Sequence, residues 1–239
     1  MADRERIGQL HESEIAHYDA QAARELVEAE KLRAEAREVS ARADNEESAA
    51  ATSRILYERE AEKRAKELAA NEHHHVYVFD ESVSEGSVKK CINQLTLWAR
   101  QKPDCEIELQ INSPGGSVID GFALIDFIRD LREKGHEVTT VAFGMAASMA
   151  GVLLQAGDKR VMGANCLLLI HEASYGISGD HGDVEDRVEM VKIMHDKILS
   201  LFAERSSLNK AQIGRKWRRK DWWLPAEIAL KHGFIDEVR

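Results

Sequence analysis

Apolar residues recur along the first part of the chain with the spacing of a helix. From residue 7 to residue 39 apolar or small side chains return every three to five positions, among them Ile7, Leu10, Tyr18, Leu26 and Val39, and the mean step is close to the α-helical period. Residues 9–85 contain neither glycine nor proline, and the stretch to about residue 71 is dense in Ala, Glu, Arg and Lys, which favour helix. The pattern predicts a helix, or a pair of helices, with one weakly apolar face.

Two interpretations of this helical segment stay open. Many of the repeating positions are alanine, and Asn45, Ser48, Thr52 and Ser53 interrupt the pattern, which argues against a strong, long coiled coil. A mostly solvated helix fits this composition. A helix that associates with another copy of the chain or docks a partner fits it as well.

The pattern changes at residue 76, where short strand-like apolar runs begin to alternate with amphipathic helical segments. That alternation is typical of an α/β domain. The strands are expected near residues 76–79, 107–111, 138–143, 160–162 and 167–170. The helices are expected near residues 87–99, 118–134, 148–155 and 184–206. We therefore divide the chain into a helical N-terminal extension, residues 1–72, and an α/β domain, residues 73–239.

Composition narrows the classes of function. The formal net charge of −9 disfavours non-specific nucleic-acid binding. No run of about 18 uncharged apolar residues occurs, and the first ten residues are charged, unlike a signal peptide. We therefore expect a soluble, cytoplasmic protein with neither a nucleic-acid nor a membrane partner. Three widely separated cysteines, Cys91, Cys105 and Cys166, lack metal-ligand spacing, and three consecutive histidines at 73–75 cannot easily all face one site, so no metal is expected.

Two turns supply the first candidates for chemistry. Residues 111–117, Ile-Asn-Ser-Pro-Gly-Gly-Ser, run from a strand through a tight turn into a helix, and the adjacent glycines let a developing oxyanion approach the backbone amides. Residues 144–151 follow the strand at 138–143 and place Ser148 near a helix N-terminus. The amides and helix dipole there favour the negative charge of an acyl-transfer transition state, although serine is also a common helix N-cap.

His171 directly follows the apolar run at 166–170, so we expect it at the end of a short buried strand, with its imidazole at the sheet edge. A neutral histidine is the group that accepts a serine proton near pH 7. The residues alone do not decide the acid, because six aspartates follow: Asp180, Asp183, Asp186, Asp196, Asp221 and Asp236. Asp221 precedes Trp222, Trp223 and Leu224, which could bury a carboxylate against an imidazole, whereas the basic run at 215–220 fits an ordinary surface ion pair.

Together these segments resemble the proteolytic subunits of Clp proteases over roughly residues 76–238. The family pattern Asn-Ser-Pro-Gly-Gly is matched by residues 112–116, and the nucleophile motif Gly-x-Ala-Ala-Ser-Met is matched by residues 144–149. His171 matches the catalytic histidine. The closing pattern of the family, an aspartate leading into Ala, Glu and Gly-Phe-Ile-Asp, is matched by Asp221, Ala226, Glu227 and residues 233–236.

The resemblance implies a crotonase-like α/β spiral of ββα units and a serine endopeptidase that needs no cofactor. Ser148 is then the nucleophile, His171 the general base and Asp221 the residue that orients it. The backbone amides of Gly116 and Met149 form the oxyanion hole. The resemblance further implies homo-oligomeric, usually heptameric, rings that enclose the sites and receive polypeptide substrates from a partner AAA+ unfoldase.

Two departures from the family pattern leave the partner and the substrate open. Glu172 and Ala173 stand where many members carry Gln-Pro, and the long extension replaces the short N-terminal loops that line the axial pore in the housekeeping enzymes. A phage or prophage head maturation protease, which cleaves capsid proteins without an unfoldase, fits the same motifs. Acyl-CoA chemistry on a crotonase-like fold competes, but it needs no serine nucleophile. The non-enzymatic alternative is a catalytically idle ring scaffold that binds partners through its N-terminal helix.

Overall fold

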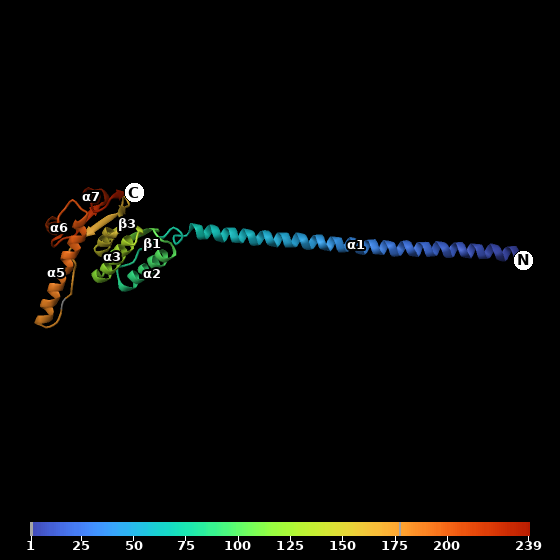
Figure 1. Ribbon diagram of the computed structural model, residues 1–239, viewed down its shortest axis with the longest axis horizontal. Helices are drawn as coiled ribbons and strands as arrows, with labels where there is room; N and C mark the ends of the chain where they lie inside the picture. The colour runs from blue at the N-terminus through green and yellow to red at the C-terminus, as the bar shows by residue number, and fades with distance from the viewer. Residues whose placement is uncertain (1, 177) are drawn as a thin grey trace. The chain divides into compact units, whose positions relative to one another are not determined.

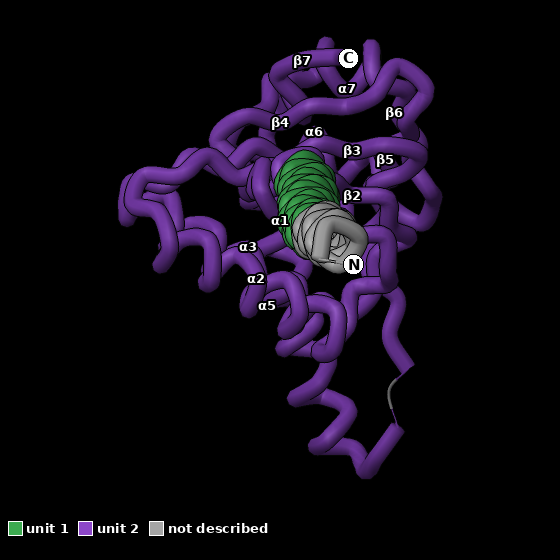
Figure 2. Tube along the Cα trace, turned by 90° about the vertical axis from the view of Figure 1, so that its right-hand side faces the viewer, with its two compact units in different colours: residues 1–67 green, residues 68–239 purple. Residues whose placement is uncertain are grey.

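The computed structural model describes the backbone of residues 2–176 and 178–239, and the side chains of residue 21 and of residues 24–176 and 178–239. Two compact units make up the chain, Met1–Glu67 and Leu68–Arg239 (Figure 2). The sequence placed a domain boundary after residue 72, and whether the two parts fold separately stays a prediction.

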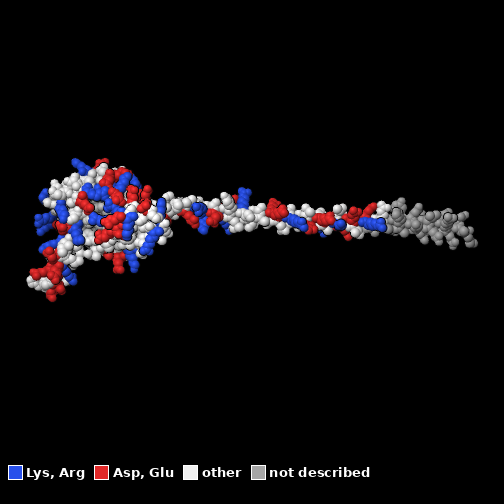
Figure 3. Space-filling model, in the orientation of Figure 1, with Lys and Arg blue, Asp and Glu red and all other residues white. Residues whose placement is uncertain are grey.

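The first unit is a single helix. α1, Ala2–Ala69, runs without a break for 68 residues, so the pair of helices that the sequence left open is not formed. Every residue from 24 to 69 is exposed. Acidic and basic side chains alternate along it (Figure 3), and ion pairs one turn apart, such as Glu38–Arg42 at 2.7 Å and Arg54–Glu58 at 3.0 Å, each add about 0.3–0.5 kcal/mol. Among the described residues no helix is long and apolar enough to span a bilayer.

The second unit is built on a sheet that has seven strands in the described part of the chain. Five of them follow one another in parallel in the order β1 (Val76–Phe79), β2 (Glu106–Ser113), β3 (Glu137–Ala147), β4 (Lys159–Met162) and β7 (Glu237–Val238). β5 (Leu167–Ile170) pairs in parallel with the end of β3, and β6 (Trp222–Pro225) pairs antiparallel with β5.

Helices connect and cover these strands (Figure 1). They are α2 (Glu85–Gln101), α3 (Val118–Glu133), α4 (Met149–Leu153) with the 3₁₀ turn η1 (Leu154–Ala156), α5 (His181–Glu204), α6 (Lys210–Trp217) and α7 (Ala226–Lys231). Side-chain caps fix where the first two begin, because Ser84 accepts a hydrogen bond from the Ser87 amide and Ser117 accepts one from the Asp120 amide. α2 and α3 pack against each other, and α4 lies against β2, β3 and β5.

The core follows the alternation that the sequence shows. In β2, Ile107, Leu109 and Ile111 are buried at every second position, and α3 buries one apolar face against the sheet. The three cysteines are buried free thiols, and burial raises the pKa of Cys166 to about 11. The expected α/β class with a long N-terminal helix is confirmed.

All nine elements expected in the α/β domain are present, but their limits differ and four elements were missed. β3 continues to Ala147, where the sequence suggested a turn after residue 143. α5 begins at His181, three residues before the predicted start, and ends at Glu204. β6, β7, α6 and α7 were not predicted. They are two to eight residues long, too short for a periodic signal.

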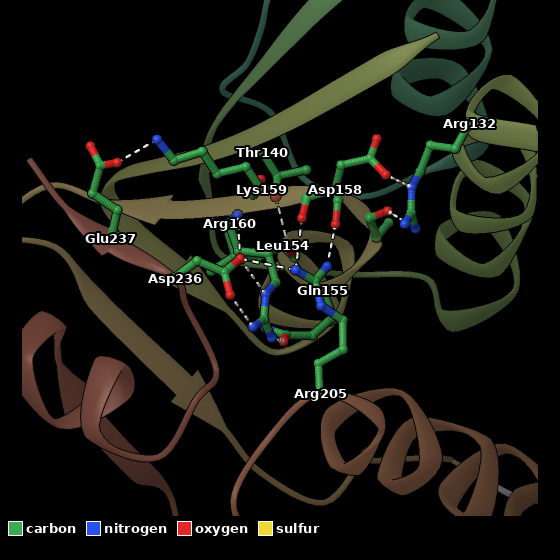
Figure 4. Close-up of polar contacts among 12 residues, drawn as sticks. Arg132, Thr140, Leu154, Gln155, Asp158, Lys159, Arg160, Arg205, Asp236 and Glu237 are labelled. Atoms are coloured by element: carbon green, nitrogen blue, oxygen red, sulfur yellow. Dashed lines mark hydrogen bonds and ion pairs between the residues drawn. The ribbon is translucent and has the colours of Figure 1, made fainter. Parts of the chain in front are cut away.

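A buried cation connects the C-terminal end of the chain to the sheet (Figure 4). The side chain of Arg160 on β4 is only 2% exposed and donates to both carboxylate oxygens of Asp236, at 3.0 and 2.6 Å. Gln155 accepts from the same guanidinium at 2.9 Å, and Arg205 at the end of α5 donates to Asp236 at 3.0 Å. Burial by itself would raise the pKa of Asp236, but the hydrogen bonds and charge of Arg160 hold it below its ordinary value.

Candidate active site

The strand register at the end of β3 brings together two turns that are far apart in sequence, those at Gly115 and Ser148. Ile111 of β2 pairs with Ala142, yet Ser113 pairs with Ala146, so four steps along β3 match two along β2. This bulge advances β3 by two residues. Continued past the strand ends, the shifted register sets Gly115 level with Ser148.

The polar residues of the Asn-Ser-Pro-Gly-Gly segment hold this arrangement. Asn112 Oδ1 accepts a hydrogen bond from the Met145 amide at 3.3 Å, which ties the bulged part of β3 to β2. Ser113 Oγ, fully buried, accepts from the Gly115 amide at 3.2 Å and shapes the turn. Both contacts explain why this segment needs side-chain acceptors before its glycines.

The turn at Gly115 lies directly against the turn at Ser148. A side-chain carbon added to Gly115 would lie 2.7 Å from Ser148 Cβ and 2.9 Å from the Met149 nitrogen, too close for any larger residue. The φ angle of Gly115 is +92°, a conformation that favours glycine. The absence of a side chain therefore leaves open the space beside the Met149 amide.

The two amides expected to form an oxyanion hole are both left without a backbone acceptor in the described part of the chain. Gly116 forms a parallel bridge with Val83, in which Gly115 accepts from Val83 and Ser117 donates to it, both at 2.8 Å. Because bonding alternates along an extended chain, the Gly116 N–H points away from Val83. Met149 is the first residue of α4, and the first amides of a helix have no partner within it.

Ser148 does not serve as an ordinary N-cap. It precedes α4, but its side chain makes no capping hydrogen bond, and its backbone adopts φ 55° and ψ −124°. A residue with a side chain held there costs of the order of 1–3 kcal/mol, and such strain clusters at functional sites. The Ser148 amide donates to the Leu169 carbonyl at 3.0 Å, which fixes the turn beside the end of β5.

The antiparallel pairing of β5 with β6 sets His171 opposite Asp221. Ile170 pairs with Trp222, so the next pair in this register is His171 and Asp221, and Figure 2 shows β3, β5 and β6 side by side. The His171 Nδ1 atom lies 3.6 Å from Asp221 Oδ1, longer than a hydrogen bond. His171 Nε2 is buried and has no hydrogen-bond partner among the described residues.

Of the two settings that the sequence left open for Asp221, burial is not the one formed. The aromatic pair after Asp221 was expected to be able to bury its carboxylate, yet the Asp221 side chain is 61% exposed, against 26% for His171. The reason is the alternation of side chains along β6. Trp222 packs inward against His232 and Phe234, whereas Trp223 points outward and is 45% exposed.

The other aspartates that follow His171 have different partners or settings. Asp180 caps α5, Asp196 pairs with Lys210 at 2.9 Å, and Asp236 pairs with Arg160. Asp183 and Asp186 lie on the exposed first part of α5. Of the six aspartates, Asp221 is therefore the one that the structure brings to His171.

Glu172 is a contact residue that sequence reasoning did not assign to the site. Its Oε2 accepts a hydrogen bond from the Arg219 amide at 3.2 Å, and Arg219 has the unfavourable φ of 56°. This contact links the residue after His171 to the turn before Asp221. The only signal in the sequence was that a carboxylate stands where the resembled family often has glutamine.

Comparison with known proteins agrees with this geometry. The family model described as Clp protease matches residues 59–239. The ATP-dependent Clp protease proteolytic subunit of Deinococcus radiodurans is 36% identical over 149 residues, 62% of this chain and 71% of that protein. The ATP-dependent Clp protease proteolytic subunit 2 of Tropheryma whipplei is 32% identical over 161 residues, 66% of this chain and 87% of that protein. Since the match covers well over half of the 239 residues of this chain, the chain belongs to the Clp protease family.

Proposed function

We propose that this protein is a serine endopeptidase that hydrolyses polypeptides through an acyl-enzyme. Ser148 is the nucleophile, His171 the general base and Asp221 the residue that orients the imidazole. The proposal rests on one observation above all. Ser148 directly follows β3, His171 directly follows β5 and Asp221 directly precedes β6. Because β5 pairs with both β3 and β6, the three residues lie at the same edge of the sheet. Family membership supports the same chemistry.

The proposed reaction has two halves, acylation of Ser148 and hydrolysis of the acyl-enzyme, and His171 carries the proton in both. His171 Nε2 takes the proton from Ser148 Oγ as the oxygen bonds to the peptide carbonyl carbon. The carbonyl oxygen becomes an oxyanion, and the amides of Gly116 and Met149 donate to it. The intermediate collapses, the C–N bond breaks, and His171 gives its proton to the leaving amine. Water then attacks the acyl-enzyme with His171 again as base and restores the Ser148 hydroxyl.

Two contacts of this site are open in the isolated chain. His171 Nδ1 lies 3.6 Å from Asp221 Oδ1, so the hydrogen bond between them is not made. His171 Nε2 has no partner among the described residues, so its hydrogen bond to the nucleophile is not made either. Catalytic hydrogen bonds are often long without substrate and shorten in the Michaelis complex. We propose that substrate or neighbouring subunits close them here, which requires small movements of the exposed Asp221 turn.

We further propose that the active form is a homo-oligomeric ring, heptameric as the family resemblance suggests. Two separate apolar surfaces of the second unit support assembly. The first half of α5 projects from the unit (Figure 1) and exposes Met190 and Ile193, which fits a contact between rings. The outward face of β3 and β5 exposes the register partners Met145 and Leu167, and Trp223 is exposed on β6, where it pairs with Leu169. Light scattering of the active enzyme tests this, and a monomer with full peptidase activity contradicts it.

A head maturation protease that works without an unfoldase is a second candidate for the biological role. The observation that favours it is α1, a continuous exposed helix where short N-terminal pore loops are expected for an unfoldase-fed enzyme. The two roles separate in an assay with a protein substrate, in its folded and unfolded forms, and no ATPase present. Efficient cleavage of a folded capsid protein favours the second role. Cleavage of unfolded chains alone favours the first.

The experiment that tests the proposed chemistry is hydrolysis of short peptides by matched serine variants. Ser148→Ala should lower kcat by roughly four to six orders of magnitude. Ser48→Ala, the same substitution on the exposed α1, should leave it unchanged. A wild-type protein with no turnover on a broad peptide library would instead support the scaffold alternative, in which the α/β unit is catalytically idle.

A further inference from the structure

α1 carries a seam of apolar and small side chains that alternate steps of three and four residues. Its first positions in each heptad are Ala29, Ala36, Ala43, Ala50 and Tyr57, and its fourth positions begin with Leu32 and Val39. Leu32, Val39 and Tyr57 are 61%, 67% and 77% exposed. Over about four heptads this spacing is that of a coiled-coil seam. Leu26, Val27, Ile55, Leu56 and Leu68 are also exposed outside these positions, so the heptad spacing, and not exposure alone, defines the seam.

The charges beside this seam select the partner. In a parallel pair of helices, each seventh heptad position faces the fifth position of the following heptad on the other helix. For two copies of α1 this sets Glu28 opposite Arg33 and Arg42 opposite Glu47. The remaining facing positions are Glu35 with Ser40, Ala49 with Arg54 and Leu56 with Ala61. Two opposite-charge pairs form, and no like-charge pair forms.

We propose that α1 pairs with the α1 helix of a second copy of this chain, as a parallel, in-register coiled coil centred on residues 28–57. The inference concerns the first unit alone and does not depend on the peptidase chemistry. Alanine at successive first positions lets the two backbones approach closely. The seam also contains Glu46 and Ser53 at fourth positions, and these polar groups weaken the pairing. The helices therefore associate reversibly.

The alternative is a lone solvated helix held by its own ion pairs. Residues beside the seam do pair within the helix, as Arg42 does with Glu38 at 2.7 Å and Arg54 with Glu58 at 3.0 Å. Such pairs help to explain why α1 is helical, but they do not explain the heptad repeat of alanine with Leu32, Val39 and Tyr57. They place no requirement on the charges at 28, 33 and 47, and only Arg42 belongs to both kinds of pair.

Cysteine cross-linking of the full chain separates these possibilities. Ala36 lies in the seam and faces its own copy, whereas Ala34 lies on the opposite side of the same exposed helix. Under mild oxidation Ala36→Cys should form a disulfide dimer about tenfold faster than Ala34→Cys, since only the seam position brings two sulfurs within bonding range. The native cysteines are buried. Equal rates overturn the proposal, and so does antiparallel pairing, in which Ala36 no longer faces Ala36.

Two further changes in the Ala36→Cys background test the seam and its charges. Glu46→Leu should raise the cross-linking rate about tenfold at dilute concentration, because an apolar residue replaces a polar one in the seam, and Glu30→Leu outside the seam should not. Reversing one side with Glu28→Lys and Arg42→Glu should lower the rate severalfold through like-charge contacts. Adding Arg33→Glu and Glu47→Lys should restore it. The paired helix is contradicted if Glu46→Leu leaves the cross-linking rate unchanged. It is also contradicted if Arg33→Glu and Glu47→Lys do not restore the rate lost on reversing the charges at 28 and 42.

Discussion

The two units of this chain are formed by different kinds of interaction. α1 is held by local propensity and by ion pairs one turn apart, and its residues from 24 to 69 are all exposed. The second unit depends on pairings between residues far apart in sequence, such as Leu168 with Leu224, and on a continuous buried core. Composition is therefore enough to form α1. The site beside Ser148 exists only when non-local register is correct.

The largest effect expected from this difference is on turnover. His171→Ala should lower kcat by roughly four orders of magnitude or more, because it removes the proposed general base. His74→Ala, which removes an exposed histidine outside the site, should leave kcat unchanged. Asp221→Ala should cost somewhat less than His171→Ala. Steady-state hydrolysis of a short peptide measures all three, and an inactive Asp183→Ala beside an active Asp221→Ala would show that the acid is misassigned.

The next largest effect should be on the stability of the second unit. Asp236→Ala leaves Arg160, which is 2% exposed, without its carboxylate, and breaking a buried pair costs about 3 kcal/mol. Glu58→Ala removes an ion pair on α1 and should not move the unfolding transition of the second unit. Urea unfolding followed by tryptophan fluorescence measures both, since all four tryptophans lie in the second unit.

The same carboxylate predicts how that stability depends on pH. The folded-state pKa of Asp236 is lower than its ordinary value, after the opposing effect of burial is included, because Arg160 binds the charged form. Its contribution is therefore complete above the unfolded pKa of about 4 and is lost as pH falls through the lower folded pKa. Asp236→Asn should flatten the acid side of the stability profile. A profile that keeps the same steepness below pH 4 would contradict this assignment.

A smaller effect should follow from loosening the Asp221 turn. Glu172→Ala removes the acceptor for the Arg219 amide and should lower kcat about fivefold, since a net hydrogen bond is worth about 1 kcal/mol. Glu172→Gln keeps an acceptor oxygen and should retain most of the activity. If both variants fall equally, the charge of Glu172 matters and the positioning role is wrong.

The smallest effect should come from removing α1. A protein that starts at residue 73 should fold and cleave short peptides as fast as the full chain or faster, while its choice of protein substrates changes. Insolubility, or a loss of peptide cleavage beyond about tenfold, roughly 1.4 kcal/mol in barrier terms, would show that α1 belongs to the catalytic unit or its assembly. The family match beginning at residue 59, within α1, makes this limit worth measuring.

The spacing of apolar residues predicts the long elements of this fold that pack in a regular way along their whole length. β2 alternates buried and less buried residues along its length, and α1 is rich in helix-forming Ala, Glu, Arg and Lys from end to end. β6 was missed because its four residues, Trp-Trp-Leu-Pro, are all apolar, so no polar residue marks the outward side of the strand. The irregularity in β3 was missed because it is defined by Asn112, which lies on another strand.

The candidate site was predicted from motif order, and its geometry was not. Ser148 and His171 were identified by their places after strands, but the conformation of Ser148 is set by contacts with Gly115 and Leu169. The pairing of His171 with Asp221 follows from β5 and β6, which are more than fifty residues apart in sequence. The sequence left the exposure of Asp221 open, because a run of two tryptophans does not indicate which one points outward.

The most direct test of the account is covalent labelling of Ser148 by a fluorophosphonate probe. Only an activated serine attacks such a reagent at a useful rate, so the account predicts one labelled serine in the full chain, mapped to residue 148 by peptide mass. Ser148→Ala should abolish labelling, His171→Ala should nearly abolish it, and Ser48→Ala should not change it. A wild-type protein that remains unlabelled, or labelling that persists in Ser148→Ala, would contradict the central claim.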